Sequence, residues 1–147
     1  MDDGIEFPTV AALFQAYGQG RLTPEAATEA ALARIKSTEP ALNAFQLIDE
    51  AGARDAANAA ARRWAEGRPL GPLDGIPLTI KDIVATKGWP TLSGSLTEDS
   101  NGPWDVDAPA VARLREAGAV ILGKTTTPEF GWKGMTDSPL AGITRNP

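Results

Sequence analysis

Two short apolar segments separated by a helix constrain the fold of this 147-residue chain more than any other feature. Residues 78–80 (Leu-Thr-Ile) and 119–122 (Ala-Val-Ile-Leu) are short and apolar enough to be buried strands. Between them, residues 109–117 place their apolar side chains on one face of a helix that Asp107 can cap. A strand, a helix and a strand at this spacing predict a crossover connection in an α/β sheet.

The first half of the chain is predicted to be mainly helical and to act as scaffold. Its clearest helix start is Thr23-Pro24, because a hydroxyl cap is followed by proline at the first helical position. We expect a helix from Thr9 to about residue 17, a helix over 24–37 that ends before Pro40, a strand over 44–48 and a helix over 49–66. Trp64 is interpreted as a packing residue.

The absence of histidine and cysteine narrows the chemistry that these residues can perform. Without histidine the usual general base at neutral pH is missing, and a Ser-His-Asp triad cannot be built from this chain alone. Without cysteine there are no disulfides, thiolate nucleophiles or cysteine-ligated metals. A base must then be a carboxylate, a tyrosine or a lysine, and we expect neither a metal nor a cofactor.

Charge and hydropathy indicate the class of partner and the compartment. The net charge of −5 argues against nucleic acid or an anionic membrane as a partner. The first four residues, Met-Asp-Asp-Gly, are acidic where a secretory signal would be basic, and no apolar region follows them. The longest apolar stretch, residues 117–123, is too short to span a bilayer. These features predict a soluble cytoplasmic protein.

A series of motifs in the second half resembles one enzyme family. Residues 71–82 read Gly-Pro-Leu-Asp-Gly-Ile-Pro-Leu-Thr-Ile-Lys-Asp and resemble the lysine motif of the amidase-signature family, the Ser-cisSer-Lys hydrolases. Further segments are similar to that family in its own order and spacing: residues 107–114, 118–125, 127–130 and 140–147. The matched segments cover most of residues 70–147, whereas the N-terminal helices fit the family layout with less specific evidence.

The resemblance implies an α/β fold in which N-terminal helices precede the first part of the family's mixed sheet. We expect residues 1–147 to form a single, truncated domain, with 1–68 mainly helical and 69–147 the start of the catalytic α/β core. Because further strands of that sheet would come from later polypeptide, apolar edges should be exposed near Leu78 and Val120. Residues 127–129 (Thr-Pro-Glu) look like one more helix start.

The resemblance makes Lys81 the catalytic base. In the family the neutral amine takes a proton from a bridging serine, which takes one from the nucleophilic serine. A lysine has an ordinary pKa of about 10.4, so this role requires desolvation, and the end of a strand within a sheet could provide it. A carboxylate beside the amine would oppose that role, so we expect the Asp82 side chain to diverge from Lys81. Lys124 is interpreted as structural, because the upstream glycines of a phosphate loop are absent.

The serines of the family mechanism are not found in this chain. No Gly-Ser-Ser-Gly-Gly segment occurs, and the nearest imitation, Ser93-Gly94-Ser95, precedes the helix at 109–117 instead of following residue 147. We expect those serines to make loop hydrogen bonds. By resemblance, Gly131 and Trp132 line the substrate pocket, Gly131 by permitting close backbone approach and Trp132 as an apolar wall. Trp132 as a core residue is the open alternative.

These motifs predict the N-terminal portion of an amidase that hydrolyses a carboxamide C–N bond in a small-molecule substrate through an acyl-enzyme. The portion alone should be inactive, and its first partner should be the remaining C-terminal part of the polypeptide. A homodimer of the full-length protein is left open. Two alternatives stand beside this interpretation: the glutaminase-type subunit of a tRNA-dependent amidotransferase, and a non-catalytic interaction module.

Overall fold

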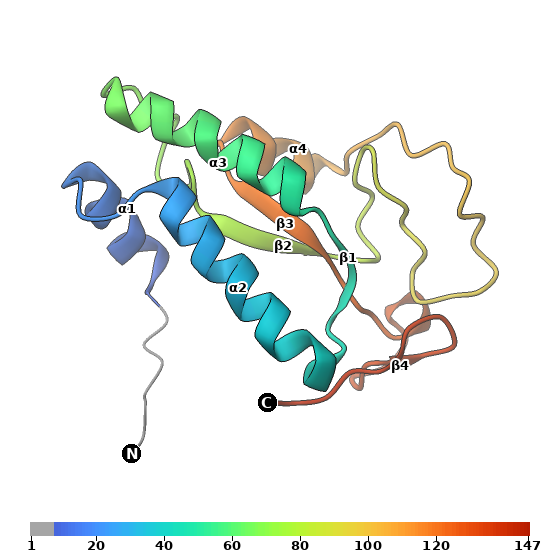
Figure 1. The fold of residues 1–147 in the computed structure, drawn as a ribbon. Helices are drawn as coiled ribbons and strands as arrows, with labels where there is room; N and C mark the ends of the chain where they lie inside the picture. Colours follow the sequence, from blue (N-terminus) through green and yellow to red (C-terminus); the bar gives the residue numbers. More distant parts are fainter. Residues whose placement is uncertain (1–7) are drawn as a thin grey trace, which may run out of the picture.

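The computed structural model describes residues 8–147 and has the expected mixed α/β architecture (Figure 1). Its helical elements are α1 (Val10–Gly18), α2 (Pro24–Leu42), α3 (Glu50–Ala65), α4 (Pro109–Glu116) and the 3₁₀ turn η1 (Glu129–Gly131). Its strands are β1 (Phe45–Ile48), β2 (Pro77–Lys81), β3 (Val120–Thr125), β4 (Asp137–Ser138) and β5 (Gly142–Ile143). The acidic first four residues, on which the prediction of no secretory signal depends, lie outside the described residues. Within residues 8–147 no helix is long and apolar enough to cross a membrane.

The main sheet has three strands in the order β1-β3-β2. β3 is parallel to β2 and antiparallel to β1, so the crossover predicted from the strand, helix and strand spacing is confirmed. Because β3 lies between two neighbours, Val120 is fully buried, and our expectation of an exposed edge there is wrong. β2 has no second strand neighbour among the described residues, so the free edge expected near Leu78 is confirmed.

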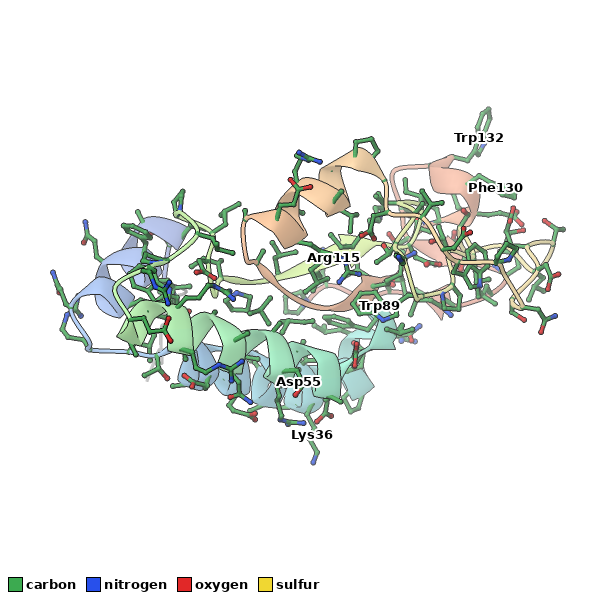
Figure 2. All side chains as sticks on the ribbon, turned by 90° about the horizontal axis from the view of Figure 1, so that it is seen from above. Lys36, Asp55, Trp89, Arg115, Phe130 and Trp132 are labelled. Carbon is green, nitrogen blue, oxygen red and sulfur yellow. The ribbon has the colours of Figure 1, made fainter. Side chains whose placement is uncertain are left out.

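Helices cover both faces of this sheet. Figure 2, viewed from above, shows α2 and α3 on one side of the strands and α4 on the other. Alternate residues of β3 point to opposite faces, as the pleat of a strand requires. Val120 and Leu122 pack with buried residues of α2 and α3, whereas Ile121 packs with Ile80 of β2 and Val111 of α4. The alternation of β3 therefore forms two separate apolar layers.

The N-terminal helix caps follow the sequence signals. The side chains of Thr9, Thr23 and Asp49 each accept a backbone N–H three residues later, at the starts of α1, α2 and α3. The predicted end of α2 is wrong, because the helix continues through Pro40 to Leu42. Proline removes one hydrogen bond of the last turn, but Asn43, in the left-handed conformation, donates its N–H to the carbonyl of Glu39 and closes the helix.

Three predictions for the second half are wrong in whole or in part. Asp107 does not cap α4, because its carboxylate accepts the backbone N–H of Lys87 and pairs with Arg115 instead. Ala110 is exposed, so only part of the predicted apolar face of α4 is buried. The helix expected after Thr127 is only the single turn η1, in which Phe130 has a φ of 51° that an α-helix cannot continue.

Candidate active site

The turn before β2 is tied to helix α3 by a buried carboxylate. Asp74 is fully buried, and Arg63 donates to it twice, with Nε–Oδ2 at 2.9 Å and Nη2–Oδ1 at 2.5 Å. The backbone N–H of Leu70 donates to the same carboxylate at 2.9 Å. A bidentate arginine–carboxylate pair is both strong and directional. Asp74, the first of the two aspartates in the 71–82 motif, therefore has a structural role.

Aromatic side chains hold the same turn from the other side. Trp64 Nε1 donates to the carbonyl of Asp74 at 3.0 Å, and the Tyr17 hydroxyl donates to the carbonyl of Gly75 at 3.1 Å. The rings of Trp64 and Tyr17 pack edge to face at 5.7 Å, which confirms the packing role predicted for Trp64. Gly75 has a φ of 82°, and a Cβ there would lie 2.7 Å from Pro24. These contacts fix where β2 starts.

Lys81 is the last residue of β2, where the strand enters the long loop of the second half (Figure 1). Its Nζ donates to the backbone carbonyl of Thr126 at 3.2 Å. Among the described residues no carboxylate lies within salt-bridge distance of this amine. The side chain is exposed, so the burial that we expected is wrong for residues 8–147. The reason is that β2 is an edge strand, with sheet on one side only.

The carbonyl that accepts from Lys81 is held by a network that the sequence did not reveal. The N–H of Thr126 donates to the carbonyl of Ala44 at 2.9 Å. Thr144 Oγ1 donates to the carbonyl of Asn43 at 2.7 Å and lies 2.7 Å from Thr126 Oγ1, which donates to the carbonyl of Ala44 at 3.2 Å. The only signal in the sequence was the threonine run at 125–127, which carries no information on its distant partners.

Asp82, the residue after Lys81, turns into the interior. It is almost fully buried, and its Oδ1 lies 3.0 Å from the Nζ of Lys124, which is itself fully buried. Lys124 Nζ also donates to the carbonyl of Pro90 at 3.0 Å and to Thr91 Oγ1 at 2.5 Å. The expected divergence of the Lys81 and Asp82 side chains is therefore confirmed.

The interpretation of Lys124 as structural is also confirmed, because an amine with no solvent exposure cannot receive a phosphate from solution. Burial lowers the pKa of Lys124 below its ordinary value, and the contact with Asp82 opposes this effect. The ion pair thus joins β3 to the residue that follows Lys81 and to the loop at residues 90–91.

The serines of the 93–95 segment make loop hydrogen bonds, as predicted. The N–H of Ser93 donates to the carbonyl of Asp82 at 3.0 Å, and its carbonyl accepts from the N–H of Phe130 at 2.7 Å. Ser95 Oγ donates to Glu129 Oε1 at 2.7 Å. This segment therefore connects the chain just after Lys81 to the turn η1.

The two predicted substrate-binding residues lie at η1. Trp132 is 90% exposed, so its interpretation as a core residue is wrong, and Figure 2 shows its ring pointing away from the fold. Gly131 has a φ of 69°, and a Cβ there would lie 3.3 Å from Cδ1 of Ile83, two residues after Lys81. A hollow of about 350 Å³ adjoins this turn. It is lined by Glu129, Phe130, Trp132, Lys133, Asp137 and Pro139.

Residues 8–147 offer no group of three or more acidic, histidine or cysteine side chains that could hold a metal ion. The region around Lys81 presents an exposed amine, a fixed carbonyl and nearby apolar side chains.

Comparison with known proteins agrees with the motifs. The family model described as Amidase matches residues 26–147. The chain belongs to the amidase family. Its mixed α/β fold matches the N-terminal part of amidase-signature enzymes of known structure. An example is the native peptide amidase from Stenotrophomonas maltophilia, with a TM-score of 0.86 and 35% identity over 97% of this chain and 30% of that enzyme.

Curated relatives carry more than one activity in their names. A glutamyl-tRNA(Gln) amidotransferase subunit of Chloroflexus aurantiacus is 43% identical over 139 residues, which are 95% of this chain and 28% of that protein. The indoleacetamide hydrolase of Bradyrhizobium diazoefficiens is 41% identical over 87% of this chain and 24% of that protein. This member of the amidase family thus spans under a third of the length of these relatives.

Proposed function

We propose that this chain supplies the base-bearing part of an amidase that hydrolyses the C–N bond of a small-molecule carboxamide. The supporting observation is the placement of Lys81. It lies at the carboxyl end of β2 inside the family's lysine motif, and its amine contacts a neutral backbone carbonyl and no carboxylate of residues 8–147. An amine without a counter-ion loses its proton more readily than a paired one.

In this proposal the neutral amine of Lys81 takes a proton from a bridging serine, which takes the proton of the nucleophilic serine. The nucleophile attacks the carbonyl carbon, the C–N bond breaks, and the leaving nitrogen departs with the proton that Lys81 returns through the bridge. Water then hydrolyses the acyl-ester by the same route. Both serines would belong to polypeptide beyond Pro147, so residues 1–147 alone would hydrolyse no amide.

The remaining C-terminal part of the amidase polypeptide is the first partner that we propose. Within residues 8–147 no strand pairs with the outer edge of β2, and an apolar groove of about 580 Å³ runs beside it, lined by α2 and by Pro77, Leu78 and Thr79. Lys81 does not line this groove. Further strands packed there would complete the sheet and could also bury Lys81, which supplies the desolvation that its role as base requires. A cytoplasmic location and a homodimer of the whole protein remain predictions.

A chimera tests this function. Residues 1–147 replace the matched region of the Stenotrophomonas maltophilia peptide amidase, and hydrolysis of a peptide amide is followed by release of ammonia. We expect turnover by the chimera and a loss of about 10² to 10⁴-fold in kcat for Lys81→Ala, the range typical of a general base. The matched control is Lys87→Ala. Lys87 is an exposed lysine whose hydrogen bonds are made by its backbone, so its replacement should change kcat less than about twofold.

Equal activity in the Lys81→Ala and Lys81 chimeras would refute the assignment of the base. A chimera that folds but shows no turnover would instead favour the non-catalytic interaction module.

A second candidate is the glutaminase-type subunit of a tRNA-dependent amidotransferase. It is favoured by the 43% identity to the Chloroflexus aurantiacus amidotransferase subunit. Residues 131–138, Gly-Trp-Lys-Gly-Met-Thr-Asp-Ser, look more like a general amidase. A second chimera, with the remainder of that Chloroflexus aurantiacus protein, separates the two candidates. Ammonia released from glutamine by this second chimera only, with none released from peptide amides by the first, would favour the glutaminase.

A further inference from the structure

The carboxylates around the carboxyl ends of β2 and β3 are engaged by groups other than Lys81. The acidic residues of the segments that meet there are Asp82 after β2, Glu39 in the last turn of α2, Glu129 in η1 and Asp137 in β4. Glu39 accepts the backbone N–H groups of Ala44 and Phe45 at 2.9 and 3.0 Å. Its charge therefore caps the turn between α2 and β1.

The other two peripheral carboxylates also have partners of their own. Glu129 accepts from Ser95 Oγ at 2.7 Å. Asp137 pairs with Lys133, the nearest cation along the chain. Neither is within salt-bridge distance of Lys81, whose acceptor is the neutral carbonyl of Thr126.

Asp82 is the carboxylate nearest to Lys81 along the chain, since it is the next residue. The separation of the two side chains begins where β2 ends, with Lys81 in the strand and Asp82 in the turn that follows it. Lys124 completes it, because its amine lies 3.0 Å from the Asp82 carboxylate and is anchored by Pro90 and Thr91. No hydrogen-bond donor of residues 8–147 is aligned with either oxygen of Asp82, so the ion pair with Lys124 is the contact that offsets the burial of this charge.

We infer that Lys124 is a positioning residue for the catalytic base: by holding the Asp82 carboxylate inside the fold, it keeps the neighbouring amine of Lys81 free of a counter-ion. The inference rests on the proposed role of Lys81. The fully buried Lys124–Asp82 pair would then have an electrostatic role in addition to its role in packing. If Lys124 were apolar, the buried carboxylate would lose its partner and would turn toward Lys81, the cation next to it. An opposite charge within about 4–6 Å favours the charged form of an ionisable group and moves its pKa by about 1 to 3.

Competitive acylation of lysines measures this directly, without turnover. The 147-residue chain is treated with trace acetic anhydride at pH 9, and mass spectrometry gives the labelling of Lys81 relative to Lys36. Only neutral amines react, and Lys36 projects into solvent from the outer face of α2, so it serves as an internal reference (Figure 2). The labelling ratio follows the fraction of Lys81 that is neutral. A substitution that raises the pKa of this amine by one unit would therefore lower the ratio about tenfold.

The expected result is a fall of about tenfold or more in the ratio for Lys124→Met and its recovery in the double variant Lys124→Met/Asp82→Asn. Asp82→Asn alone should leave the ratio unchanged. A Lys124→Met ratio equal to that of the wild type would overturn the inference. A several-fold increase for Asp82→Asn would also overturn it, because Asp82 would then already be the counter-ion of Lys81.

If Lys124→Met does not fold by circular dichroism, the conservative Asp82→Asn variant still tests the premise that Asp82 is held away from Lys81, and an increased ratio overturns the inference. An inactive chimera and a failed labelling test are separate results, so the loss of one proposal is distinguishable from the loss of the other.

Discussion

The two ends of strand β2 are built in opposite ways. At the amino end, the buried carboxylate of Asp74 binds Arg63, and two aromatic side chains donate to the adjoining backbone. At the carboxyl end, the exposed amine of Lys81 makes one hydrogen bond with the described part of the chain, to a carbonyl. Exposed apolar side chains gather in the segments that follow, including Ile83, Phe130, Trp132 and Met135.

The amino end of β2 therefore stabilises the fold, whereas the carboxyl end exposes groups that can contact another molecule or another segment of polypeptide. Both ends belong to one continuous motif, residues 71–82, so resemblance alone assigns them equal importance. The structure instead predicts that substitutions at the amino end change the free energy of unfolding. Substitutions at the carboxyl end should change activity and leave stability nearly unaltered.

The largest expected effect on stability is that of Asp74→Ala. Removing the carboxylate leaves the guanidinium of Arg63 and the N–H of Leu70 without their acceptor, and breaking a pair with a buried member typically costs about 3 kcal/mol or more. Chemical denaturation of wild type and variant, measured side by side, checks this value. The control is Asp55→Ala on the exposed face of α3, expected to stay within about 0.5 kcal/mol (Figure 2). Equal losses in both variants would contradict the anchoring role of Asp74.

The next effect is a pH dependence at the same end. Burial raises the pKa of Tyr17 to about 12. The unfolded phenol titrates at about 10, so the unfolded chain loses this proton first. The contribution of Tyr17 is fully present below pH 10 and is lost as the pH rises through 12, a change of roughly 2–3 kcal/mol. Tyr17→Phe should lack this decline and, at neutral pH, lose about 1 kcal/mol with the hydrogen bond to Gly75.

This titration can be followed by absorbance, because Tyr17 is the only tyrosine in the chain. The phenolate signal should have its midpoint near 12 in the folded protein and near 10 in denaturant. A native midpoint near 10 would show that the ring is not buried against the turn before β2.

The smallest effect on stability is expected at the other end, for Trp132→Ala. A side chain that is 90% exposed contributes little to folding, so the free energy of unfolding should change by less than about 0.5 kcal/mol. In the chimera this variant should raise KM more than it lowers kcat, if Trp132 forms a wall of the substrate site. Trp64→Ala, the matched change at the anchored end, should cost about 2 kcal/mol, less than a fully buried tryptophan, because the ring is only partly buried. A clear loss of stability in Trp132→Ala would contradict the difference in stability effects expected between the two ends of β2.

Much of the fold could be predicted from the sequence because its signals are local. The helix starts at Thr9, Thr23 and Asp49 depend on a side chain and an N–H three residues away, and all three are confirmed. The apolar run before Lys81 likewise gave the strand and its end correctly. Asp107 was misread because its capping signal competes with distant partners, Lys87 and Arg115, that only the folded chain brings near.

The sequence by itself determined the family, the crossover between β2 and β3, and Lys81 as the candidate base, because these follow from short-range patterns of residue type. The tertiary structure decided the surroundings of that base. It placed the carbonyl of Thr126 at Lys81, paired Asp82 with Lys124 and left Lys81 and Trp132 exposed. These two contacts join residues more than 40 positions apart, so their geometry depends on how distant segments pack and not on any local pattern of residue types.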